Sequence, residues 1–276
     1  SLSGGEETIV ASVRDGNGNV TTYTSMAAAF EAINVSEDAG PFYMTVPYTS
    51  EGIDWSGSAT VPNKKTTIDF SGNNVCLPAS LVLQAPLTIK NINNFTNADG
   101  GELCTLEAGD NAFVMQNGGS FGFAKISGSN LTFDKILPHS TPLGSEPCQL
   151  VGTGNNAVLH IQNVGSSSYI YDLPDMNGFS ELILTDAYMK INAGEAAKLK
   201  RVTLNNGGLT VLDTVELSSI GGNGTLRFAE GASLTVTDQA EGTFRLPDLS
   251  DNAPVPVTVP ANSALILKNA NGDIVE

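Results

Sequence analysis

The stretch Leu226-Arg-Phe-Ala-Glu-Gly-Ala-Ser-Leu234-Thr-Val-Thr-Asp238 aligns without a gap on Val257-Thr-Val-Pro-Ala-Asn-Ser-Ala-Leu265-Ile-Leu-Lys-Asn269. Each copy is a short apolar strand, a turn of small residues, a second short strand, and then Asp or Asn. Looser copies begin at Val202 and at Leu182. Several short strands within a repeat of about 20–30 residues are typical of a β-solenoid. The sequence therefore predicts an all-β fold, a single-stranded parallel β-helix.

The repeat also predicts which strands stack. Matched first strands should form one parallel sheet from Leu182–Leu184, Val202–Leu204, Leu226–Phe228 and Val257–Val259. Matched second strands should form another from Met189–Ile191, Leu209–Val211, Leu234–Val236 and Leu265–Leu267. In this register Asp213 and Asp238 would lie on neighbouring coils, about 5 Å apart. Two carboxylates at that spacing could bind Ca²⁺ or shift each other's pKa. Alternatively, each Asp ends a strand and bonds to the next turn.

The N-terminal part predicts a cap for the first coil, whose open end would otherwise expose apolar side chains and unpaired strand edges. Residues 9–13 and 20–23 alternate as strands around the turn sequence Asp15-Gly-Asn-Gly-Asn19. Ser25 is a suitable helix N-cap. After it, apolar residues at helical spacing give one buried face, formed by Met26, Ala29, Phe30 and Ile33.

This combination of hairpin and helix carries a family resemblance. Val13-Arg-Asp-Gly-Asn-Gly-Asn-Val-Thr-Thr-Tyr23, followed by Ser25-Met-Ala-Ala-Ala-Phe-Glu-Ala-Ile33, resembles the entry motif of bacterial surface proteins with pectate-lyase-like, right-handed parallel β-helices. The resemblance covers about 20 residues and the repeat style. It implies a capped β-helix and an extracellular or bacterial cell-surface location. It also raises an enzymatic alternative, because many such β-helices cleave acidic polysaccharides.

The expected organisation is one domain with a cap. Residues 1–8 read as a flexible acidic leader of a trimmed, mature chain, residues 9–62 as the cap with an irregular segment, and residues 63–276 as the parallel β-helix. The stretches 137–156 and 241–256 are rich in Pro and Gly and should project as loops. The cap helix is the one convincing helix pattern.

Composition excludes several classes of function. Charged residues are 15% and the net charge is −16, which disfavours nucleic acids and anionic membrane surfaces as partners. No apolar run is long enough to span a membrane. The charge also opposes binding of polyanions, unless a local basic groove or bound Ca²⁺ reverses the field. Cations and neutral glycans remain compatible ligands.

Metal and thiol chemistry have little support. The three cysteines, Cys76, Cys104 and Cys148, form no CxxC motif and sit beside apolar residues, so buried free thiols are expected. His139 and His160 are about one coil apart and could approach each other, but a third ligand would be needed for a metal site. We therefore expect no cofactor, with Ca²⁺ at Asp213 and Asp238 as the alternative.

The enzymatic alternative lacks a basic partner. Arg201 and Arg227 adjoin repeat strands but are equally suited to a solvated face, and no pectate-lyase-type arginine motif is present. We therefore predict no turnover of pectin, polygalacturonate or alginate. Exposed aromatic rings could instead stack on sugars. The candidate ligand-binding residues are Tyr169, Tyr171, Tyr188, Trp55, Asp213 and Asp238.

Taken together, these features favour a non-catalytic, exported or cell-surface, adhesin-like protein that binds a glycan or a protein ligand. The alternatives are a carbohydrate-active enzyme, either a glycosidase or a polysaccharide lyase, and a structural spacer. Aromatic side chains beside an acid–base pair in one groove would favour the enzyme. Aromatic side chains in a shallow groove without that pair would favour binding, and a smooth polar surface would favour the spacer.

Overall fold

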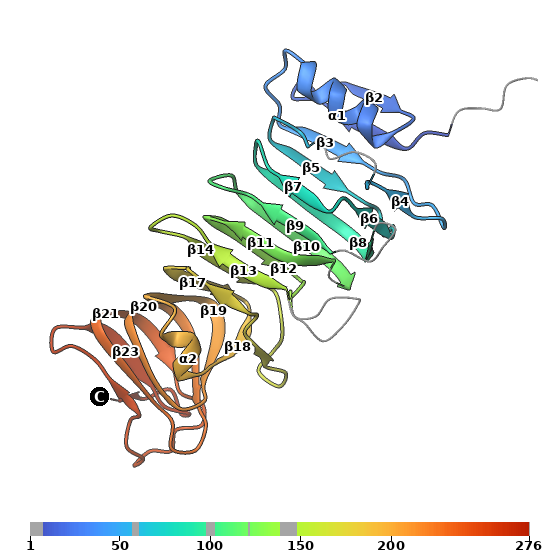
Figure 1. Cartoon of the computed structure of the whole chain (residues 1–276). Coiled ribbons are helices and arrows are strands. Elements are labelled where there is room, and N and C mark those ends of the chain that lie inside the picture. Colours follow the sequence, from blue (N-terminus) through green and yellow to red (C-terminus); the bar gives the residue numbers. More distant parts are fainter. Residues whose placement is uncertain (1–7, 57–60, 98–102, 121, 139–147, 276) are drawn as a thin grey trace, which may run out of the picture. The chain divides into compact units, whose positions relative to one another are not determined.

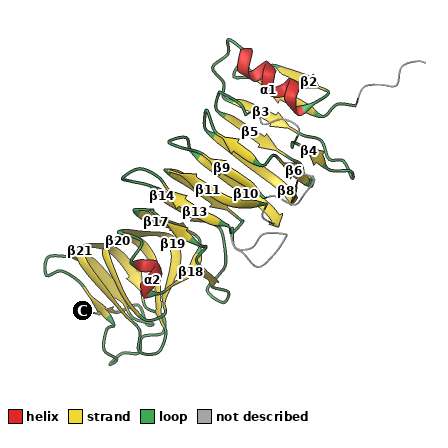
Figure 2. Ribbon diagram, in the orientation of Figure 1, coloured by secondary structure: helices red, strands yellow, loops and turns green. Residues whose placement is uncertain are grey.

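A computed structural model of the chain describes residues 8–56, 61–97, 103–120, 122–138 and 148–275. It is 51% strand and 6% helix, and parallel strands form about 10 solenoid turns in all. The predicted all-β parallel solenoid is thus confirmed (Figure 1, Figure 2). The chain divides into two compact units: unit 1 comprises residues 1–128 and 138–149, and unit 2 comprises residues 129–137 and 150–276.

Unit 1 opens with the predicted hairpin. Strands β1 (Ala11–Arg14) and β2 (Val20–Tyr23) pair antiparallel. The Asp15 carboxylate accepts hydrogen bonds from the backbone N–H groups of Asn17 and Asn19, both at 2.9 Å, which closes the turn. These bonds give the acidic turn sequence a structural role within the hairpin.

Helix α1 (Met26–Val35) follows the hairpin, and Figure 2 shows it in red beside β2. Ser25 Oγ accepts a hydrogen bond from the Ala28 N–H at 3.0 Å, as its predicted capping role requires. The buried residues of the helix are the four predicted ones, Met26, Ala29, Phe30 and Ile33. The 3.6-residue period of the sequence was therefore sufficient to place this face.

Aromatic packing joins α1 to the first coils. The Phe30 ring lies 5.6 Å from that of Trp55, which lies 6.0 Å from that of Phe70. All three side chains are fully buried. Trp55 was predicted as a ligand-binding residue, but it belongs to the core of unit 1 and offers no surface to a ligand. Its position after the two-residue strand β4 (Ile53–Asp54) gave no alternation from which its inward direction could be read.

Parallel pairing begins earlier than the expected residue 63. Strand β3 (Phe42–Thr45) pairs antiparallel with β1 but parallel with β5 (Thr66–Asp69). Residues 42–45 are thus already part of the coil stack, within the segment that the sequence assigned to the cap. A strand this short, set among Gly and Pro, shows too few alternations to reveal its period.

Three lines of parallel strands build the coils of unit 1. One joins β3, β5, β8 (Leu87–Asn97) and β10 (Phe113–Ser120). A second joins β4, β6 (Val75–Leu77) and β8, and a third joins β7 (Ser80–Val82), β9 (Cys104–Glu107) and β11 (Phe123–Gly128). Alternate side chains of these strands point inward, as in the buried column formed by Met44, Ile68, Ile89 and Met115.

Asparagine residues turn one corner of these coils. Asn91 and Asn117 have φ values of 61° and 55°, in the left-handed region that Asn tolerates. Their amides form a ladder: Asn117 Nδ2 donates to Asn91 Oδ1 at 3.1 Å, and Asn91 Nδ2 donates to Asp69 Oδ1 at 2.9 Å. This corner gives a structural reason for the abundance of uncharged polar residues.

The ladder also controls the ionisation of Asp69. Burial alone would raise the pKa of this carboxyl group, but the bonds from Asn91 and the Ser71 N–H, together with Lys90 and Tyr43, lower it below 3.8. A lowered pKa in the folded state stabilises the fold above the pKa of the unfolded chain. This contribution is lost as the pH falls through the lowered value.

We therefore expect the substitution Asn91→Ala to raise the pKa of Asp69, because it removes the strongest of the lowering interactions. A carboxyl-carbon NMR titration would measure the change. Asn93→Ala is the matched control, since Asn93 Nδ2 donates to Asn74 Oδ1 and not to Asp69. An unchanged Asp69 pKa in Asn91→Ala would show that the ladder does not set this ionisation.

The coils of unit 2 have three faces. The first face stacks β12 (Asn130–Asp134), β14 (Val158–Gln162), β17 (Glu181–Thr185), and the opening part of β19 (Arg201–Val211). The second face stacks β18 (Tyr188–Ile191) on the closing part of β19. The long strands β20 (Thr214–Phe228) and β21 (Ser233–Arg245) pass through all three faces, and the third face stacks their opening parts with β22 (Val257–Thr258).

The remaining elements of unit 2 are short. Strand β13 (Gln149–Gly152) pairs with β16 (Met176–Asn177), and β15 (Tyr171–Asp172) pairs with β18. Strand β23 (Ala264–Lys268) pairs parallel with β21, and β24 (Ile274–Val275) folds back antiparallel on β23. Helix α2 (Ala193–Ala196), closed by a capping box between Asn192 and Glu195, was not predicted because one helical turn is too short to show a period.

The predicted register is correct for the earlier copies and wrong for the later ones. Leu182 pairs with Val202, and Met189 with Leu209, as expected. However, Leu226 pairs with Leu209 on the second face, and Leu234 pairs with Val257 on the third. The two copies that match best in sequence, residues 226–238 and 257–269, are therefore displaced from each other by one face of the coil. All three faces require the same apolar–polar–apolar pattern, so sequence similarity cannot tell adjacent faces apart.

The two predicted loops were drawn too long. The stretch 137–156 contains β13, and the stretch 241–256 includes the end of β21. Residues 139–147 lie outside the described part of the chain. In the stretch 241–256, turns are present at residues 247–248 and 251–252. The strands next to the predicted loops are too short or too rich in glycine to be recognised from the sequence.

Candidate functional site

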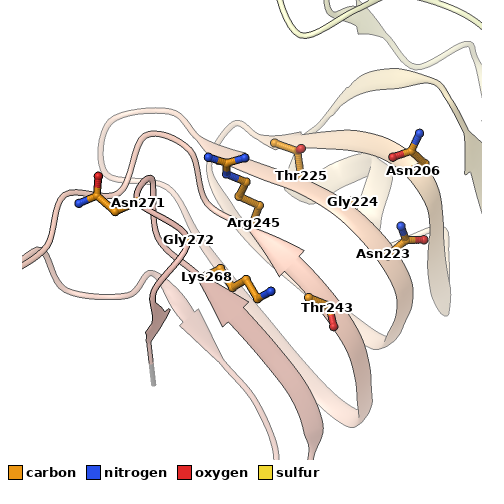
Figure 3. A pocket seen from close by; sticks show the side chains of 9 residues that line it. All are labelled: Asn206, Asn223, Gly224, Thr225, Thr243, Arg245, Lys268, Asn271 and Gly272. Carbon is orange, nitrogen blue, oxygen red and sulfur yellow. The ribbon is translucent and has the colours of Figure 1, made fainter.

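A polar groove of unit 2 lies on the outward side of its second face, shown in Figure 3. Its volume is about 620 Å³. It is lined by amide, hydroxyl and basic side chains and by glycine backbone, from Asn206, Asn223, Gly224, Thr225, Thr243, Arg245, Lys268, Asn271 and Gly272. Amides, hydroxyls and cations that converge on a shallow surface are suited to a polar ligand.

The strand register builds this groove. Thr225 pairs with Arg245, and Arg245 with Lys268, on three consecutive coils. Paired residues of parallel strands point to the same side and are separated by about 4.8 Å. Their neighbours Phe244 and Leu267 are buried, so the alternation directs Arg245 and Lys268 outward. A second column places Asn223 beside Thr243.

The groove differs in charge from the chain as a whole. None of its lining residues is Asp, Glu or His, although the net charge of the chain is −16. Arg245 Nη2 donates to the Ala270 carbonyl at 3.0 Å, which orients the guanidinium group. Neither Arg245 nor Lys268 forms an ion pair with a described residue. The groove therefore presents two adjacent cations that form no ion pair within the described part of the chain.

Two carboxylates outside the lining are bonded to its amides, and one of them is Asp186, whose Oδ1 accepts a hydrogen bond from Asn206 Nδ2 at 2.9 Å. Asp251 Oδ1 accepts a hydrogen bond from Asn271 Nδ2 at 2.8 Å and another from Asn269 Nδ2 at 3.2 Å. These bonds hold the turn that carries Asn271. Asp251 therefore acts on the groove by positioning an amide that lines it.

The other arginines of unit 2 are already engaged. Arg201 lies 3.2 Å from a carboxylate oxygen of Glu181 and 3.1 Å from one of Glu241, and it joins coils of the first face. Arg227 lies 2.9 Å from Asp248. Both basic residues named from the sequence therefore have a structural partner, whereas Arg245 and Lys268 were not singled out.

The structure does not bring Asp213 and Asp238 to equivalent places. Asp213 lies in the short connection between β19 and β20 and accepts a hydrogen bond from the Ala193 N–H at 2.8 Å. Asp238 lies within β21, between the parts that belong to the third and first faces. The predicted pairing was wrong because it depended on the displaced register. Asp213 instead has the strand-end bonding that was the alternative interpretation.

Asp238 lines a separate groove of about 380 Å³, together with Gln239, Glu241 and residues 260–264. Within the described part of the chain, no group of three or more His, Cys, Asp and Glu residues is placed to hold a metal ion. The arrangement that motivated Ca²⁺ at Asp213 and Asp238 is thus not formed.

The three candidate tyrosines lie close together in space, around Gly165. The Tyr169 and Tyr171 rings are 4.8 Å apart, edge to face, and Tyr169 is 63% exposed. The Tyr188 N–H donates to the Val164 carbonyl at 2.9 Å, so their loop runs beside β18. Tyr188 itself pairs with Gly208, which pairs with Thr225 of the groove. Of the sequence candidates, Tyr188 is the one in the same column as Arg245.

Burial shifts the pKa values of two candidate reactive groups outside the groove, Cys104 and His160. Burial raises the pKa of the Cys104 thiol to about 12, so it stays protonated at neutral pH. Burial also lowers the pKa of His160, although Asp134 and Glu181 oppose this shift. His160 Nε2 lies 2.7 Å from Thr185 Oγ1, and His139 is outside the described residues.

Sequence reasoning missed the residues of the groove because they are far apart in the chain. Thr225, Arg245 and Lys268 are separated by coils of unequal length. The alternation of inward and outward side chains within each strand could be read from the sequence. Which outward side chains stack in one column depends also on the register between the strands. The usable signal was the pattern Thr243-Phe-Arg245 in one strand and Ile266-Leu-Lys268 in another.

Among the described residues, no helix is long and apolar enough to cross a bilayer.

Comparison with known proteins adds no further information on the site. No protein family, curated protein or solved structure matches the chain.

Proposed function

We propose that this protein is a non-catalytic, exported or cell-surface β-solenoid that binds an acidic glycan in the groove of Arg245 and Lys268. The observation that carries the proposal is the pair of cations on consecutive coils, which form no ion pair with a described residue and are flanked by amide and hydroxyl side chains. Sugar hydroxyls need donors and acceptors, and a sugar carboxylate or sulfate needs a cation. This local field removes the objection that the net charge of −16 raised against anionic glycans.

The proposed location depends on the resemblance of the hairpin and helix at residues 13–33 to bacterial surface proteins. The acidic composition is compatible with that location, since a net charge of −16 opposes self-association. The groove itself supports binding of a ligand in preference to a purely structural spacer role. An adhesin-like function, in which the solenoid holds a glycan at the cell surface, combines both features.

The groove composition favours binding over cleavage. Glycosidases of the usual type need two carboxyl groups across the scissile bond, and lyases need a base. The lining residues contain no carboxyl group and no histidine. The carboxylates of Asp238 and Glu241 lie in another groove, and Glu241 is bound to Arg201.

We expect the double substitution Arg245→Gln and Lys268→Met to weaken binding of acidic glycans by about tenfold to a hundredfold, because hydrogen bonds to charged groups contribute about 1.5–3 kcal/mol. A glycan array of acidic and neutral sugars, followed by titration calorimetry at two salt concentrations, would measure this loss. Wild-type binding should also weaken at higher salt. Arg227→Gln is the matched control, because Arg227 lies on the same face but is paired with Asp248.

Two outcomes would overturn the proposal. One is the absence of binding to any acidic glycan, or binding that the double substitution leaves unchanged. The other is product release from a polysaccharide panel, assayed with and without Ca²⁺, that is lost in Asp238→Asn or Asp213→Asn. The second result would support the carbohydrate-active enzyme instead.

A further inference from the structure

We propose that the ring of Tyr188 forms a sugar-stacking subsite at the Asn206 end of the groove. The ligand would then be a linear acidic oligosaccharide that runs across the coils, and not a single terminal sugar. This inference depends on the proposed glycan-binding function and specifies its ligand.

The strand register places Tyr188 in line with the cations of the groove. Tyr188 pairs with Gly208, Gly208 with Thr225, Thr225 with Arg245, and Arg245 with Lys268. These are four steps between coils, each of about 4.8 Å, so the column is about 19 Å long. A monosaccharide is too small to contact both Tyr188 and Lys268, whereas a chain of several pyranose units can do so.

The neighbouring glycine determines how the Tyr188 ring lies. A Cβ atom added to Gly208 would be 2.6 Å from Tyr188 Cδ1 and 3.1 Å from its Cε1. The ring therefore covers the backbone of Gly208, where only glycine leaves room for it. One side of the ring packs on this strand, and Tyr188 remains partly exposed on the outward side.

The composition of the column matches the two sides of a sugar chain. The C–H face of a pyranose packs on an aromatic ring, while its hydroxyls need polar partners. Asn206, Asn223, Thr225 and Thr243 line the same groove as the two cations and supply such partners, as Figure 3 shows. Arg245 and Lys268, three and four coils away from the aromatic ring, then receive an acidic group.

The test uses the full chain and size series of hyaluronan, alginate and polygalacturonate fragments, from the monosaccharide to the hexasaccharide. We expect the affinity of the wild-type protein to rise with length until the fragment spans the column. Tyr188→Ala should weaken hexasaccharide binding by about tenfold and monosaccharide binding by less than about twofold. Tyr188→Phe should bind like wild type, because stacking needs the ring and not the hydroxyl group.

Two further variants test whether the loss of binding comes from the position of the Tyr188 ring. Gly208→Ala keeps the tyrosine but forces its ring to move, so it should reproduce the loss seen in Tyr188→Ala. Tyr48→Ala removes an exposed tyrosine of unit 1 and should leave binding unchanged. Thermal unfolding by circular dichroism would check that each variant is folded at the temperature of the titration.

The outcomes separate this inference from the function on which it depends. If no fragment binds, the proposed glycan-binding function fails. If fragments bind through Arg245 and Lys268 but affinity is independent of length, or Tyr188→Ala binds like wild type, the stacking subsite is rejected while the binding function stands.

Discussion

Replacing Gly242 by alanine is expected to lower the free energy of unfolding by about 2–5 kcal/mol. Gly242 turns a corner of β21 at φ 102°, a conformation that costs an L-residue about 1–2 kcal/mol. A Cβ atom at this position would lie 2.0 Å from the carbonyl oxygen of Gly222 on the preceding coil. Relief of that contact requires the coils to separate, at a further cost of about 1–3 kcal/mol.

Gly231→Ala is the matched control for this prediction. Gly231 also has a positive φ, 77°, but an added Cβ would have nothing within 4 Å. This variant should therefore lose only the conformational part, about 1–2 kcal/mol. Chemical denaturation of both variants would measure the difference. If both variants lost the same free energy of unfolding, the close approach of Gly242 to the Gly222 carbonyl would not constrain the spacing of the coils.

Phe30→Ala is expected to destabilise the protein by about 3–5 kcal/mol, because it deletes a fully buried ring from the junction between α1 and the first coils. The cavity would border Trp55, whose ring lies 5.6 Å away. Trp55 is the single tryptophan of the chain, so its fluorescence reports on this site. We expect a red-shifted emission in addition to a lower unfolding midpoint.

Val35→Ala provides the comparison on the same helix. Val35 is 74% exposed at the end of α1, and its truncation should change the free energy of unfolding by less than about 0.5 kcal/mol. If Phe30→Ala were as stable as Val35→Ala, α1 would not be acting as a cap on the coil stack.

The sequence by itself was sufficient for the features that depend on neighbours along the chain. The turn at Asp15, the cap at Ser25 and the buried face of α1 were all readable, because each involves residues within about two helical turns. The solenoid class was also readable, since short apolar strands separated by turns recur throughout the chain. These are local patterns, and local physics determines them.

Only the tertiary structure decided which strands stack and what gathers on the outer surface. Leu226 could match either Val202 or Leu209, because every face of a coil buries alternate side chains in the same way. The unequal lengths of the turns select one register, and that register places Arg245 beside Lys268 while it keeps Asp213 and Asp238 apart. A repeat in sequence specifies that coils form, but the outward columns that create a binding surface arise only when the coils are packed on one another.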